Sequence, residues 1–308
     1  MRRYLLTTAV LFLASLLAAD VPAVVLTSAT TPSGTGVTMN TGPGIQTDPH
    51  VRQNLATYAD VQSGQIRYYS LLDLAISNVT ASRELARDNL PDAYNNSVVF
   101  ARQTLSALDI MLFDTVSSTV TTIDPSPEAQ RLTPGIGENT NMYADYGLPG
   151  DVGLAGGPLG EIVAHDIAAS TATRLTNNAT ADQNPQVAPN GNLIVWETCP
   201  TPTNCDINQA VRSRATWTVS ILANTADSER NPDTDATNVV YHSNRPTSVA
   251  GTDIYFRLVD GGPETQLEIA GVQSNPSIAA GIIAFESSSD GVSARDRPDT
   301  IPGKGERP

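Results

Sequence analysis

The sequence predicts an all-β protein: a β-propeller built from six repeats of four strands, with the sixth blade incomplete. Three observations predict this fold. Short β-rich runs alternate with turn residues, a proline motif recurs about every 40 to 50 residues, and helical spacing is nearly absent after the first residues. Four strands in a repeat of that length are typical of a propeller blade, whose sheet buries both faces only when its neighbours pack on it.

The chain begins with Arg2 and Arg3, followed by an uncharged apolar stretch over residues 4–19. This stretch is shorter than the roughly 20 residues that span a bilayer, and small residues follow it. We therefore expect residues 1–23 to be a cleaved signal peptide and the protein to be secreted or periplasmic, with no membrane insertion. Residues 24–47, rich in Ser, Thr and Gly, form a predicted linker.

The predicted propeller covers residues 48–291, with repeats that start near residues 48, 90, 133, 184, 231 and 275. The repeats open on prolines at Pro49, Pro91, Pro134, Pro185, Pro232 and Pro276. A second anchor, an acid or amide followed by Ile, begins at Gln65, Asp109, Glu161, Asp206 and Asp253. Because a catalytic group is needed only once or twice, these recurring acids are expected to hold a turn or an adjacent blade.

The sixth repeat loses the pattern after Gly291, so two of its strands are missing. Residues 292–308 are charged and broken by proline and glycine, which predicts a disordered tail. Truncation of a longer protein or a natural tail on an incomplete blade would explain this, and we expect truncation. The open sheet edge is expected to lower stability and to favour self-association, and Thr27–Asn40 could supply one of the two strands.

With these residues in view, the chain resembles the TolB-like propeller repeats of exported bacterial proteins. The resemblance rests on the N-P openings, the P-N-G turn at Pro189, the S-N-R turn at Ser243 and the D-I-Y strand at Asp253. It implies a propeller fold but no single function, since such repeats serve as scaffolds, peptidase accessory domains and parts of surface proteins. We expect a protein other than TolB itself, because only a short linker precedes the repeats.

Composition limits the partners. The net charge of −14, without a Lys or Arg cluster, disfavours nucleic acid, so a protein or glycan ligand is expected. In an oxidising compartment Cys199 and Cys205 are predicted to form a disulfide across facing ends of the second and third strands of blade four. Two thiols without a nearby His make at most half a zinc site, so neither metal nor cofactor is expected.

Catalytic motifs are weak in this sequence. It contains no G-x-S-x-G nucleophile elbow, and its three histidines are in different repeats. Acids near the innermost strands, namely Asp48, Asp92, Asp233 and Asp235, are expected to act in turns. Their placement leaves open a carbohydrate-active enzyme with channel carboxylates. No catalytic residue is assigned.

The preferred prediction is an exported, non-catalytic binding or scaffold propeller that recognises its partner through loops on one face. The longest such loops are predicted at Thr198–Asn204 and Ser243–Thr252, which gives Asn204, Asn244 and Arg245 as candidate binding residues. The alternatives are the carbohydrate-active enzyme and one domain of a larger, truncated surface protein.

Overall fold

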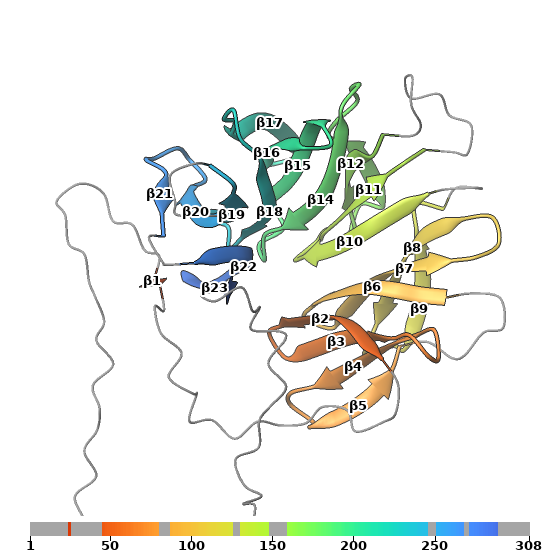
Figure 1. The fold of residues 1–308 in the computed structure, drawn as a ribbon. Coiled ribbons are helices and arrows are strands. Elements are labelled where there is room, and N and C mark those ends of the chain that lie inside the picture. Colours follow the sequence, from red (N-terminus) through yellow and green to blue (C-terminus); the bar gives the residue numbers. More distant parts are fainter. Residues whose placement is uncertain are drawn as a thin grey trace, which may run out of the picture.

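The computed structural model is built from strands and turns, with no helix among the residues it describes (Figure 1). These residues are 24–25, 45–79, 87–125, 130–147, 159–245, 251–267 and 271–288. The predicted signal peptide, most of the linker and the predicted tail lie outside them. Within the described part, no helix is long and apolar enough to span a membrane.

Five antiparallel sheets of four strands follow one another along the chain, as predicted. Sheets one and two contain β2 (Gln46–Arg52), β3 (Leu55–Asp60), β4 (Gln65–Ser70), β5 (Ala75–Asn78), β6 (Arg87–Tyr94), β7 (Ser97–Gln103), β8 (Leu108–Asp114) and β9 (Thr119–Ile123). Sheet three contains β10 (Arg131–Gly137), β11 (Thr140–Asp145), β12 (Glu161–Asp166) and β13 (Thr171–Arg174). Sheets four and five contain β14 (Ala181–Val187), β15 (Leu193–Thr201), β16 (Asn204–Ser213), β17 (Thr216–Ala223), β18 (Glu229–Thr234), β19 (Asn238–Ser243), β20 (Asp253–Leu258) and β21 (Thr265–Gln266).

Among the residues that the structure describes, the sixth sheet is incomplete, as predicted, but it is joined by a strand from near the start of the chain. It contains β22 (Val272–Ala279), β23 (Ile282–Ser288) and the two-residue strand β1 (Val24–Val25). β1 runs parallel to β23 and pairs with its first two residues. The segment proposed for this role, Thr27–Asn40, lies outside the described residues.

The proline repeat sets the register of every inner strand. The residue before each proline has a left-handed φ of 49° to 51°, and each inner strand is bulged at this point. These residues are Asp48, Leu90, Thr133, Asn184, Asn231 and Asn275. Six copies of one unusual backbone conformation confirm that the prolines occupy equivalent positions. Asn and Asp, which accept this conformation more readily than other L-residues, fill four of the six places.

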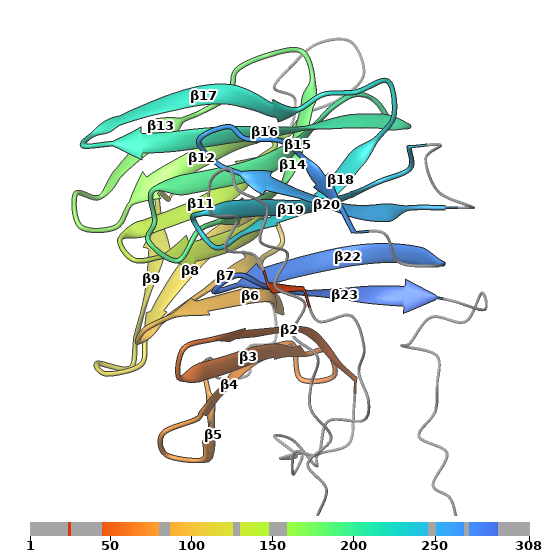
Figure 2. The same ribbon diagram turned by 90° about the vertical axis from the view of Figure 1, so that its left-hand side faces the viewer.

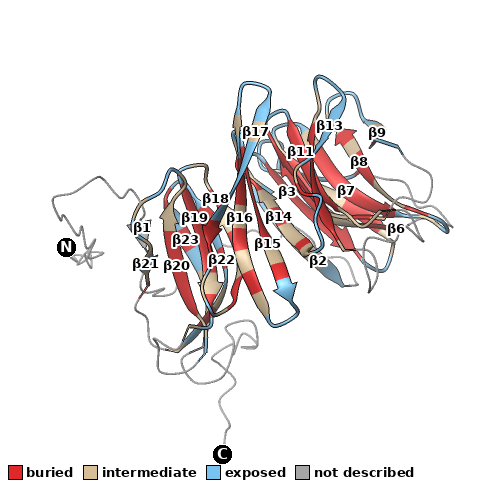
Figure 3. Cartoon of the chain, turned by 90° about the horizontal axis from the view of Figure 1, so that it is seen from above, coloured by how far each residue is buried: buried red, intermediate tan, exposed pale blue. Residues whose placement is uncertain are grey.

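The second anchor supplies the apolar layers between the sheets. Its isoleucines, Ile66, Ile110, Ile162, Ile207 and Ile254, are all completely buried. Each of the five hydrophobic clusters joins residues of one sheet to residues of the next, from sheets one and two to sheets five and six. Figure 3 shows the buried residues concentrated in the strands of the stacked sheets. Among the described strands, sheets six and one lack comparable packing on each other.

Candidate binding face

Antiparallel pairing brings four sets of strand ends to one face of the propeller. These are the starts of the first and third strands and the ends of the second and fourth strands. We call this the entry face, and Figure 2 shows the stacked sheets from the side. Asn204, Asn244 and Arg245 all lie at this face, because they begin β16 or directly follow β19.

The predicted disulfide is present on the entry face. Cys199 of β15 and Cys205 of β16 are bonded, with their Cα atoms 4.0 Å apart. The predicted loop Thr198–Asn204 is wrong in extent, however, because β15 continues to Thr201 and β16 begins at Asn204. A bulge between Thr198 and Thr201 accommodates the extra residues, which leaves a two-residue turn.

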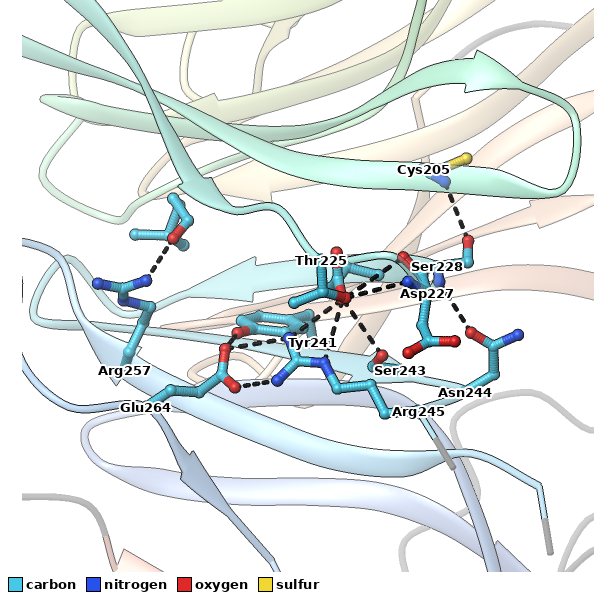
Figure 4. A network of polar contacts seen from close by, with 12 residues as sticks. Cys205, Thr225, Asp227, Ser228, Tyr241, Ser243, Asn244, Arg245, Arg257 and Glu264 are labelled. Carbon is cyan, nitrogen blue, oxygen red and sulfur yellow. Dashed lines mark hydrogen bonds and ion pairs between the residues drawn. The ribbon is translucent and has the colours of Figure 1, made fainter. Parts of the chain in front are cut away.

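Cys205, the residue after Asn204, is linked to Asn244 through Ser228. The backbone N–H of Cys205 donates to Ser228 Oγ at 3.1 Å, and the backbone N–H of Ser228 donates to Asn244 Oδ1 at 2.8 Å (Figure 4). The Oδ1 atom of Asn204 is buried without a hydrogen-bond partner among the described residues. The structure therefore brings these two candidates into one region between sheets four and five.

Arg245 lies in a polar network inside sheet five. Its guanidinium donates to Glu264 (Figure 4) and to Glu229. Its Cζ atom lies 4.4 Å from the centroid of the Tyr255 ring. Glu229 is completely buried, and the Arg245 side chain is only 14% exposed. These contacts give Arg245 a structural role. Its assignment as a ligand contact remains a prediction.

The charges of this network support one another. Burial alone would raise the pKa of Glu264, but hydrogen bonds from Arg245 and Tyr241 hold that pKa below its ordinary value. The pKa of Tyr241 is raised, first by burial and then by its hydrogen bond to Glu264. Near neutral pH Glu264 is therefore a carboxylate paired with the Arg245 guanidinium, and Tyr241 is a neutral phenol.

Acids of the inner strands join neighbouring blades. Asp92 Oδ2 accepts the backbone N–H of Ile136 at 2.9 Å, and Asp233 Oδ2 accepts that of Ile278 at 2.9 Å. Both acids directly follow a repeat proline, so the same inter-blade bond occurs twice. Asp235 likewise accepts the N–H of Gly281 in the sixth sheet. The predicted role in local turns is thus incomplete, because these carboxylates also hold the next blade.

Arg52 of the first sheet reaches across the central channel. Its Nη1 donates to the carbonyl oxygens of Ile136 and Val187, at 3.2 and 3.1 Å, and these belong to sheets three and four. Burial raises the pKa of Asp233, although the N–H of Ile278 and the charge of Arg52 partly oppose this effect. Asp233 is nevertheless half-buried rather than completely enclosed.

A small pocket opens among the bulges of sheets one to four. It is lined by Asp48, His50, Leu90, Pro91, Asp92, Thr133, Pro134, Pro185 and Gln186. Of the four candidate channel acids, this pocket brings only Asp48 and Asp92 together. Both oxygens of Asp92 accept backbone N–H groups, and His50 Nδ1 lies 3.5 Å from Oδ1. A pair of carboxylates free for acid–base chemistry is therefore not assembled in this pocket.

One group of three potential metal ligands occurs in the described residues: Glu197, Cys199 and Cys205. Both sulfur atoms belong to the disulfide, so they are not available as thiolate ligands. Glu197 is fully buried and accepts the backbone N–H of Asn231 at 2.8 Å and the side-chain amide of Asn184 at 3.0 Å. These bonds make it a link between sheets four and five.

Sequence reasoning missed a difference between the two halves of the ring. At one position of the second strand, sheets one to three carry Ala59, Ala101 and Ala144, whereas sheets four to six carry Glu197, His242 and Glu286. The same three later sheets have Asn before the repeat proline. Asn231 Nδ2 donates to Asn275 Oδ1, and Asn275 Nδ2 donates to Glu286. Alignment of the repeats column by column would reveal this pattern.

These features define a propeller that is built from repeats. Its entry face is polar and contains a disulfide bond. No family model and no curated protein matches the chain. Among solved structures, TolB from Acinetobacter baumannii is similar over 76% of this chain and 57% of its own length, with 15% identity and a TM-score of 0.51. The chain thus spans little more than half of that protein.

Peptidase propellers are similar as well. The β-propeller domain of the Trilobed protease from Pyrococcus furiosus, described as having an open velcro topology, matches with 11% identity and a TM-score of 0.55. The match covers 80% of this chain and 78% of that one. Pyrococcus horikoshii acylaminoacyl peptidase matches with 12% identity and a TM-score of 0.57, over 79% of this chain and 42% of its own. At these identities the likeness shows the fold alone, a β-propeller similar to those of TolB and the peptidases.

Proposed function

We propose that this protein is an exported, non-catalytic binding or scaffold propeller that recognises a protein or glycan partner through its entry face. The observation that carries the proposal is that acids of the inner strands hydrogen-bond to the neighbouring blade. Asp92, Asp233 and Asp235 each accept a backbone N–H from the following blade. Carboxylates that hold the frame in this way favour a rigid platform over an acid–base site.

The strand ends at the entry face are held rigidly, which favours recognition of a partner there. The disulfide and the Arg245 network fix the ends of the strands there, so side chains between them are held in place before a ligand arrives. Export is supported by the disulfide together with the predicted signal peptide, because disulfides persist in oxidising compartments.

Site-specific photo-crosslinking in the exporting host tests this proposal. A photoreactive residue replaces Thr203, in the exposed turn of the entry face, or Val116, which is 76% exposed on a turn at the opposite face. In parallel, the purified protein is applied to an array of defined glycans. We expect discrete adducts at position 203 and none at position 116, or glycan binding that Asn204→Ala weakens.

Three results would contradict the proposal. The first is the same adduct pattern at both positions, and the second is the absence of both adducts and glycan binding. The third is release of reducing sugar from the array, which would favour the carbohydrate-active alternative.

A further inference from the structure

The outermost strand of sheet four differs from those of the other complete sheets. β17 has eight residues, whereas β5, β9, β13 and β21 have four, five, four and two. Short outer strands protect a sheet from pairing with another chain, because they leave few unpaired N–H and C=O groups. No described strand pairs with the outer edge of β17.

The side chains of β17 do not protect its edge from pairing with another chain either. The strand contains no charged residue and no proline, although the chain carries a net charge of −14. Val219 is 44% exposed and Ile221 is 62% exposed, and they alternate with Thr and Ser. Figure 3 shows the exposed strand at the rim. An uncharged edge with exposed β-branched residues suits strand pairing.

The open part of the edge ends at Ile221. β16 pairs Ile207 with Ala223 and Asn208 with Ile221, so Leu222 is a bulged residue. Its carbonyl oxygen accepts a hydrogen bond from Arg257. The stretch available to another strand is therefore Thr216–Ile221.

Charges beside this stretch favour a second copy of the same chain. Arg214 is exposed in the turn before β17, and Asp227 follows the strand; neither side chain has an ion pair among the described residues. Figure 4 shows the Asp227 carboxylate outside the hydrogen-bonded network. Antiparallel pairing about a twofold axis would bring the basic end of each edge to the acidic end of the other.

We infer that two copies associate through β17, in antiparallel register, with the twofold axis between Val219 and Ser220. In this register Val219 pairs with Ser220 and Thr218 with Ile221 of the other copy. Arg214 of each copy then lies beside the end of the other copy's β17, where the connection that carries Asp227 begins. The contact is isologous, as expected for a homodimer.

Sedimentation velocity from about 1 to about 300 µM, a range that detects weak association, tests the inference. The wild-type protein is expected to show a monomer–dimer equilibrium. Ile221→Lys should weaken dimerisation at least about tenfold, since it places a charge in the paired edge. Val116→Lys places the same charge at an exposed position outside β17 and should leave dimerisation unchanged.

Charge exchange tests the register without disturbing the strand. Arg214→Glu and Asp227→Arg should each weaken the dimer, and the double variant should restore it. Circular dichroism melting confirms that each variant is folded. A wild-type protein that stays monomeric, equal effects of Ile221→Lys and Val116→Lys, or no rescue in the double variant would overturn the inference. The entry-face proposal is independent of these results.

Discussion

At the scale of single residues, the fold depends on a backbone conformation that few side chains tolerate. The residue before each repeat proline has a left-handed φ, which costs an ordinary L-residue about 1–2 kcal/mol. Asn suits this position in the last three sheets, whereas Leu90 and Thr133 do not. Thr133 carries a second cost, because its buried hydroxyl lacks a hydrogen-bond partner among the described residues.

Thr133→Asn is therefore expected to stabilise the protein by about 0.5–1 kcal/mol, as part of the left-handed penalty is relieved. Urea unfolding measures the change. The control is Thr121→Asn, in the outer strand β9, where φ is not positive and no gain is expected. A lower midpoint for Thr133→Asn than for the wild type would contradict this explanation.

His165 predicts a dependence of stability on pH. It is 7% exposed and has a buried Nδ1 without a hydrogen-bond partner among the described residues. Burial lowers its pKa, and the nearby charges of Asp124 and Asp166 only partly oppose this. Because the unfolded state binds a proton near pH 6.5, before the folded state does, stability should fall as pH falls from about 6.5 through the folded pKa.

His165→Gln should flatten this dependence between about pH 7.5 and pH 5.5, as measured by urea unfolding at several pH values. The control is His50→Gln, since the His50 side chain is 41% exposed. An unchanged slope in His165→Gln would show that another group, such as His242, causes the dependence.

At the scale of elements, the contacts between blades determine how firmly the sheets stack. Asp233 accepts the N–H of Ile278 and the hydroxyl of Ser277, and both residues belong to β22. Asp233→Asn can place an amide donor against these donors, so it should cost about 1–3 kcal/mol. Urea unfolding compares it with Asp260→Asn, at an exposed turn. Equal stability of the two variants would argue against this contact.

The disulfide is expected to shape the entry face more than to stabilise the whole fold. Cys199 and Cys205 are six positions apart, and such a short loop contributes about 2 kcal/mol on the chain-entropy model. The double variant Cys199→Ser/Cys205→Ser should remain folded with a slightly lower melting temperature. Thiol titration of the denatured, unreduced protein checks the bond itself, and two reactive thiols would contradict it.

Sequence predicted the elements better than it predicted their contacts. The repeat prolines and the anchor isoleucines recur along the chain, so the repeats were found from the sequence. By contrast, the bonds of Asp92 and Arg52 join residues of different sheets. Their geometry depends on how the blades stack, which is not a local property of the sequence. The extent of the loop predicted at Thr198–Asn204 was wrong because β15, with a bulge, continues to Thr201.

At the scale of the whole molecule, successive sheets share continuous apolar layers, whereas sheets six and one do not share comparable packing in the described part. Sheets four, five and six are also joined by side-chain hydrogen bonds through Glu197, Asn231 and Asn275. The two halves therefore differ in chemistry while they keep one backbone frame.

An experimental structure of the protein tests this account most directly, because the account depends on one frame repeated six times. We expect six sheets around a common channel, with Pro49, Pro91, Pro134, Pro185, Pro232 and Pro276 at equivalent positions and a left-handed residue before each. Two stacked sheets, or prolines that fail to superpose when the blades are aligned, would contradict the account.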